Sequence, residues 1–66
     1  MISLKLANDI YTKDNIEKAR TAYKNIAVTK AIHKKEITNI IFLKCKYDED
    51  RTIKEFENYL IGLENS

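Results

Sequence analysis

The stretch Ile37–Tyr47, ITNIIFLKCKY, decides the fold of this chain. It is dense in β-branched and aromatic residues, and no glycine or proline interrupts it, so it predicts a β-strand. Side chains of a strand alternate between two faces. The more apolar set is expected to face the core: Ile37, Asn39, Ile41, Leu43, Cys45 and Tyr47. The other set is expected on the open face: Thr38, Ile40, Phe42, Lys44 and Lys46.

Large apolar residues on both faces are typical of an interior strand, so a neighbour is expected on each side of this stretch. Ile2–Ala7 alternates apolar and polar residues, which predicts a half-buried strand with Ile2, Leu4 and Leu6 toward the core. Ala27–His33 predicts a weaker strand. It is expected to form a hairpin with the central strand, pairing Ile32 with Ile37 and Val28 with Ile41 on the core face.

Two further segments repeat apolar residues with the period of a helix. The first, about Lys13–Asn25, follows Thr12, a good N-cap residue, and its stripe is Ile16, Ala19, Tyr23 and Ile26. The second begins after an acidic cluster, Asp48–Asp50, that suits a helix N-terminus. Its stripe is Ile53, Phe56, Leu60 and Leu63, and Gly62 is expected near the end of the regular helix.

The element order is therefore β-α-β-β-α, which predicts a two-layer α+β sandwich with two helices on one face of a three-stranded sheet. It is the order of a ferredoxin-like fold that lacks its last strand. By that analogy the sheet order is 1-3-2 and antiparallel, with the strand from Ile37 in the middle. The alternative is a parallel pairing of the first and second strands, which would leave the most apolar strand at an edge. No linker composition divides the chain, so residues 1–66 are expected to form a single domain.

Composition limits the classes of function. A chain of 66 residues buries only about 60% of its unfolded surface, so self-association is an expected supplement to its small core. The single cysteine, Cys45, excludes an internal disulfide and fits a reducing compartment. The net charge of +2 is too small to indicate nucleic-acid binding. With no signal peptide and no apolar run of about 18 residues, a cytoplasmic protein without a membrane segment is expected.

The first candidate site is an edge of the sheet. In the predicted order the strand Ile2–Ala7 lies at an edge, and it carries only one protective charge, Lys5. Leu4, Lys5 and Leu6 are therefore expected to pair through their backbone with another strand. The partner is either a second copy, giving a homodimer, or another protein or peptide.

The second candidate site is the open face, where Ile40, Phe42, Lys44 and Lys46 would form an apolar patch with a basic rim. A nucleic-acid-binding regulator is the alternative function, but only Phe42 could stack on a base there. No pattern for catalysis, a metal or a cofactor is present: His33 is expected to be a solvated turn residue, and Asp48–Asp50 to cap a helix. The sequence predicts a non-enzymatic interaction module.

Two segments carry a resemblance to a known family. They are IEKARTAY at residues 16–23 in the first helix and EFENYL at residues 55–60 in the second. Together with the hairpin between them, they resemble HxsD, the His-Xaa-Ser repeat system protein of peptide-maturation gene clusters. The resemblance implies an accessory role beside a radical-SAM enzyme that acts on a ribosomally made peptide. It implies no catalytic residues in this chain.

Overall fold

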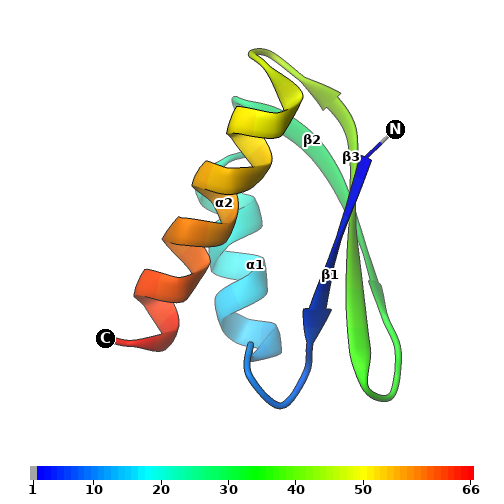
Figure 1. Cartoon of the computed structure of the whole chain (residues 1–66), viewed down its shortest axis with the longest axis vertical. Helices are drawn as coiled ribbons and strands as arrows, with labels where there is room; N and C mark the ends of the chain where they lie inside the picture. Colours follow the sequence, from blue (N-terminus) through cyan, green and yellow to red (C-terminus); the bar gives the residue numbers. More distant parts are fainter. Residues whose placement is uncertain (1) are drawn as a thin grey trace.

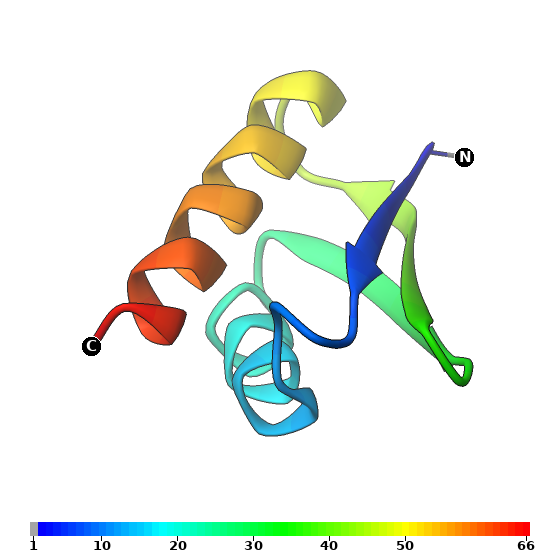
Figure 2. The ribbon, with the colours of Figure 1, turned by 60° about the horizontal axis from the view of Figure 1, so that its bottom comes forward.

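The structure is a computed structural model that describes residues 2–66, and it contains five elements (Figure 1). They are β1 (Ile2–Ala7), α1 (Lys13–Ala22), β2 (Ala27–His33), β3 (Ile37–Cys45) and α2 (Glu49–Glu64). The strands form one sheet in the order β1-β3-β2, and both pairings are antiparallel. Both helices lie on the same side of the sheet (Figures 1 and 2). The predicted α+β fold, a ferredoxin-like arrangement lacking one strand, is confirmed.

Both helices begin where the sequence places a capping side chain. Thr12 accepts a hydrogen bond from the Asn15 N–H at 3.3 Å, and Asp48 accepts one from the Arg51 N–H at 3.0 Å. α1 ends at Ala22, earlier than expected, and the Tyr23 carbonyl accepts the N–H groups of Ile26 and Ala27, where the chain turns into β2. α2 runs past Gly62 to Glu64, since that glycine keeps an ordinary helical conformation.

The core lies between the helices and the face of β3 that was predicted to be open. Ile40 and Phe42 are fully buried, whereas Ile37 and Leu43 are 41% and 47% exposed. Residues directly opposite each other in a sheet share a face, and Leu6 is paired with Thr38. Because Leu6 is in the core as predicted, Thr38, Ile40 and Phe42 must also face the helices. The predicted faces of β3 are therefore wrong.

Aromatic packing accounts for this choice of face. The Phe42 ring meets Phe56 of α2 edge-to-face at 5.4 Å, and Tyr23 meets Phe56 at 5.5 Å. Phe42 is the largest side chain of β3, so its burial removes more apolar surface from water than burial of Leu43 would. The aromatic cluster therefore joins the middle strand to both helices.

The hairpin strand β2 is turned over together with β3. Val28 and Ile32 are exposed, while Ala27 is buried and Ala31 packs against the core. The expected pairing of Ile32 with Ile37 is also wrong, because Ile32 lies opposite Asn39. The hairpin thus keeps the alternation that its sequence predicts, with the opposite face directed to the helices.

A β-bulge interrupts the pairing of the hairpin. Val28 lies opposite Lys44 and Thr29 opposite Phe42, so Leu43 is an extra residue on β3. The extra residue shifts the alternation by one position. Leu43 and Lys44 are both exposed, and Cys45 turns back to pack against the core.

Candidate functional site

The outer edge of β1 presents backbone groups that no strand in the described residues 2–66 pairs. Beyond the strand, the Asn8 N–H donates to the Glu36 carbonyl at 2.9 Å, and this pair continues the register of Leu4 with Ile40. Opposed residues in antiparallel strands alternate between hydrogen-bonded and non-hydrogen-bonded pairs. Even-numbered residues of β1 therefore direct their backbone groups to β3. Odd-numbered residues direct theirs to the free edge.

This alternation revises the predicted edge residues. Leu4 and Leu6 bond to β3, and of the three predicted residues only Lys5 offers its backbone to a partner. Ser3 is the second outward-facing residue, and Ala7 is the third. The Ala7 carbonyl is already used, since it accepts the N–H groups of Ile10 and Tyr11 at 3.1 and 3.0 Å. Only the register, which the sequence does not reveal, identifies Ser3.

The outer edge of β2 differs, because a side chain occupies part of it. Arg20 of α1 donates to the Thr29 carbonyl and to the Thr29 hydroxyl, each at 3.0 Å. Glu17 holds the same guanidinium through contacts of 2.9 and 3.0 Å. The β1 edge is therefore the more accessible of the two.

The open face of the sheet carries different apolar residues from those expected. Of the four predicted residues, Ile40 and Phe42 lie in the core, while Lys44 and Lys46 are exposed. In their place, β2 and β3 present five aliphatic side chains, of which Ile41 is half-buried and the others are exposed. They are Val28, Ile32, Ile37, Ile41 and Leu43, and we call them the aliphatic patch.

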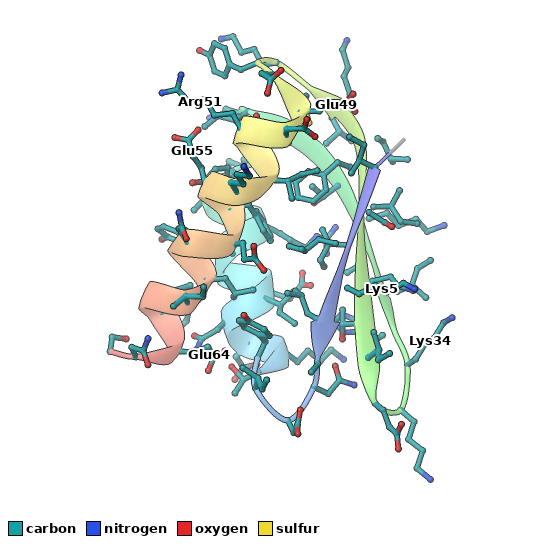
Figure 3. The ribbon with its side chains drawn as sticks, viewed as in Figure 1. Lys5, Lys34, Glu49, Arg51, Glu55 and Glu64 are labelled. Atoms are coloured by element: carbon teal, nitrogen blue, oxygen red, sulfur yellow. The ribbon has the colours of Figure 1, made fainter. Side chains whose placement is uncertain are left out.

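Lysines lie within and around the aliphatic patch. Lys30 lies opposite Ile41, Lys44 lies opposite Val28, and Lys5 projects from β1 on the far side of β3. Lys34 extends from the hairpin turn, and Figure 3 shows Lys5 and Lys34 on the side of the sheet away from the helices. Aliphatic side chains and lysines, which we call the basic rim, therefore share this face, but the predicted apolar residues Ile40 and Phe42 do not belong to it.

The burial of Phe42 bears on the nucleic-acid alternative. Phe42 was the only aromatic residue expected on the open face, and it packs against Phe56 instead. Tyr47 is exposed but follows the end of β3, where the Lys46 ammonium lies 5.7 Å from its ring centroid. The aliphatic patch thus offers no ring on which a base could stack.

A polar chain that the sequence does not reveal links the loop after β1 to the hairpin. Thr38 donates its hydroxyl proton to Asn8 Oδ1 at 2.7 Å, and the Asn8 amide donates to the carbonyls of Lys34 and Lys35. His33 Nδ1 lies 3.2 Å from the same Thr38 oxygen, and His33 Nε2 lies 3.6 Å from Glu17. His33 is thus part of a network and not a freely solvated turn residue.

In this network a carboxylate, an imidazole and a hydroxyl follow one another as in a nucleophilic triad, but the hydroxyl proton is not directed to the imidazole. A nucleophilic hydroxyl must give its proton to the histidine. Here the Thr38 hydroxyl donates its proton to Asn8 Oδ1 and so has none to give to His33 Nδ1, 3.2 Å away. Thr38 is also fully buried, so this network holds the hairpin in place and the Thr38 hydroxyl is not presented as a nucleophile.

Cys45 is a half-buried free thiol. Burial raises the pKa of the Cys45 thiol, and the negative charge of Glu49 raises it further. A higher pKa leaves less of the reactive thiolate at neutral pH. Among residues 2–66, no group of three histidine, cysteine or acidic side chains is arranged to hold a metal ion.

A shallow groove of about 620 Å³ lies between the outer sides of α1 and α2. Tyr59 and Leu63 form part of its lining, together with Asp14, Glu17 and Lys18. The groove is lined by both acidic and basic side chains. It lies on the helix layer, away from the two predicted sites, the β1 edge and the open face of the sheet.

Comparisons with known proteins give no further assignment. No protein-family model matches the chain, and no curated protein or solved structure matches it. None of the helices in the described part of the chain is both long and apolar enough to cross a membrane. The resemblance to the HxsD family therefore stays a prediction.

Proposed function

We propose that the protein is a non-enzymatic interaction module that associates by strand addition at β1. The observation that carries the proposal is the outward direction of the Ser3 and Lys5 backbone groups at an exposed sheet edge. The simplest partner is a second copy, which would join two three-stranded sheets into one of six strands. An accessory role in peptide maturation, as the family resemblance implies, would use the same edge.

The outward-facing groups favour one register for this homodimer. A two-fold axis at Leu4 would pair Ser3 of each copy with Lys5 of the other. The N–H and C=O groups of both residues would then all form hydrogen bonds between the copies. An axis at Lys5 would place two like charges directly opposite each other, which is unfavourable. An axis at Leu6 would require the Ala7 carbonyl, which already accepts two hydrogen bonds within the chain.

Solution mass by light scattering at high micromolar concentration tests the association, and Lys5→Pro tests the edge. A proline at Lys5 removes an outward N–H, so a folded but monomeric variant is expected. Lys5→Ala is the matched control, since it loses the side chain but keeps the N–H, and it should remain dimeric. Leu4→Pro is unsuitable, because it would remove a bond to β3 within the chain.

Single cysteines introduced into a Cys45→Ala background test the register. Opposed residues in a non-hydrogen-bonded pair have Cα atoms about 4.5 Å apart, within disulfide range. Leu4→Cys should therefore cross-link two copies on mild oxidation, whereas Lys5→Cys should not. Cross-linking at position 5 in preference to position 4 would overturn the register, and a monomeric wild type would overturn the homodimer.

A further inference from the structure

We infer that the open face of the sheet binds an amphipathic helix that carries carboxylates on both flanks of its apolar stripe. This surface is separate from the β1 edge, because the aliphatic patch belongs to β2 and β3. Its most exposed members are Val28 and Leu43, at 52% and 47%. Asn39 on β3 and Lys30 on β2 lie between its members on the same face. Exposed apolar surface with charged groups beside it is a usual mark of a protein-binding site.

The composition of β3 indicates that a partner covers its open face in the functional state of the protein. Ile40 and Phe42 on one face are completely buried beneath the helices. The other face also carries three large aliphatic residues, Ile37, Ile41 and Leu43, together with the polar Asn39 and Lys44. Strands that are apolar on both faces are typical of sheets with a layer on each side. A partner on the open face would supply the missing layer.

The dimensions of the open face fit one helix. Three strands place the outer strand axes about 10 Å apart, which is close to the diameter of a helix with its side chains. From Ile37 to Leu43 the strand extends about 20 Å, the length of a helix of roughly 13 residues. A helix lying along β3 would cover Ile37, Ile41 and Leu43 with one apolar stripe.

The charges around the patch specify an acidic partner. Every Asp, Glu, Lys or Arg within the three strands is a lysine: Lys5, Lys30 and Lys44. Lys5 on β1 and Lys30 on β2 stand on opposite sides of β3, so a helix along β3 would meet one lysine on each flank. Carboxylates on both flanks of the helix would pair with them.

The same charges argue against a second copy packed face to face. Such a dimer would bring the lysines of one copy against those of the other, and none of the strand residues of either copy is a carboxylate that could compensate. The acidic residues of α2 lie on the helix side, as the labelled Glu49, Glu55 and Glu64 show in Figure 3. They cannot screen the lysines of a facing copy.

Two labelled helical peptides of about 18 residues provide the test, because that length supports partial helix formation in water. They share one leucine stripe and differ only in carrying glutamates or lysines along both flanks. Fluorescence anisotropy should show at least about tenfold tighter binding of the acidic peptide, since two or more ion pairs distinguish the peptides. Raising the salt from about 50 to about 500 mM should weaken that binding.

Charge reversal at the rim separates this site from the β1 edge. The double variant Lys30→Glu, Lys44→Glu should lose the preference for the acidic peptide. Its oligomeric state, measured as solution mass by light scattering, should stay that of the wild type. Lys54→Glu, on the exposed side of α2, is the matched control and should keep the preference. Ile41→Ser should weaken binding of the acidic peptide, because it places a hydroxyl in the middle of the patch.

Three results would overturn the inference. One is equal affinity for the two peptides. Another is an unchanged preference after reversal of Lys30 and Lys44. The third is rim-dependent binding to vesicles with about 30% anionic lipid, or to a single-stranded oligonucleotide, without a preference between the peptides, because polybasic surfaces also attract lipid and phosphate.

Discussion

Ile40 and Ile41 are identical neighbours with opposite surroundings. Ile40 is completely buried beneath the helices, whereas Ile41 is half-buried on the open face. Ile40→Val should lower the free energy of unfolding by about 0.5–1.5 kcal/mol, because it leaves a methyl-sized gap in the core. Ile41→Val is the matched control and should change it by less than about 0.5 kcal/mol. Urea denaturation measures both, and a larger loss for Ile41→Val would contradict the assignment of faces.

These two residues also show where sequence reasoning stops. The sequence reveals that β3 is apolar on both sides and therefore central, but either half of the alternation is apolar enough to form the core. The decision depends on the pairing of Leu6 with Thr38 and on the aromatic contact of Phe42 with Phe56. Both are contacts between residues far apart in the chain. A short alternating pattern contains no information about them.

At the scale of elements, Glu64 ties the end of α2 to the start of α1. Its carboxylate accepts the Thr12 N–H at 2.7 Å and the Thr12 hydroxyl at 3.2 Å. The hydrogen bond from the Thr12 backbone lowers the pKa of the Glu64 carboxyl below its usual value of 4.5. The ionised carboxylate also lies at a helix N-terminus, where negative charge is favourable.

The lowered pKa of Glu64 predicts an acid-sensitive contribution to stability. Because the folded protein favours the ionised form, this contribution is present above the ordinary pKa of 4.5 and is lost as the pH falls through the lower, folded value. Glu64→Gln should therefore be less stable than the wild type at pH 7, and the difference should shrink in acid. Thermal unfolding between about pH 7 and pH 3 measures this difference. Glu57→Gln, on the same helix, is the control, and a constant difference for Glu64→Gln would contradict the assignment.

The elements themselves were the most predictable part of the molecule. Thr12 and Asp48 mark the helix starts, and the alternation of Ile2–Ala7 marks β1, because capping and amphipathic patterns are local. The bulge at Leu43 was not predictable, since it depends on how β2 and β3 align. Of the three predicted edge residues, Leu4 and Leu6 direct their backbone groups to β3 and only Lys5 directs them outward, because the hydrogen-bonding alternation is set by the strand pair and not by the sequence of one strand.

At the scale of the whole molecule, association through β1 should make thermal stability depend on concentration. A dimer that binds only folded copies is stabilised by mass action, so the melting temperature of the wild type should rise between about 5 and 500 µM. Lys5→Pro, if monomeric, should melt at one temperature across the same range. Calorimetry measures both. A concentration-independent wild type would contradict the proposed association.

The sheet strands and α2 carry charge of opposite sign, so the molecule has an electric dipole in addition to its net charge of +2. α2 carries five carboxylates against two basic side chains, while the ionised residues of the strands are all lysines. In the electric field of a negatively charged surface, such a molecule rotates so that its positive side faces the surface before contact is made. It would arrive sheet first, with the aliphatic patch foremost, so that long-range orientation and short-range apolar contact act on the same face.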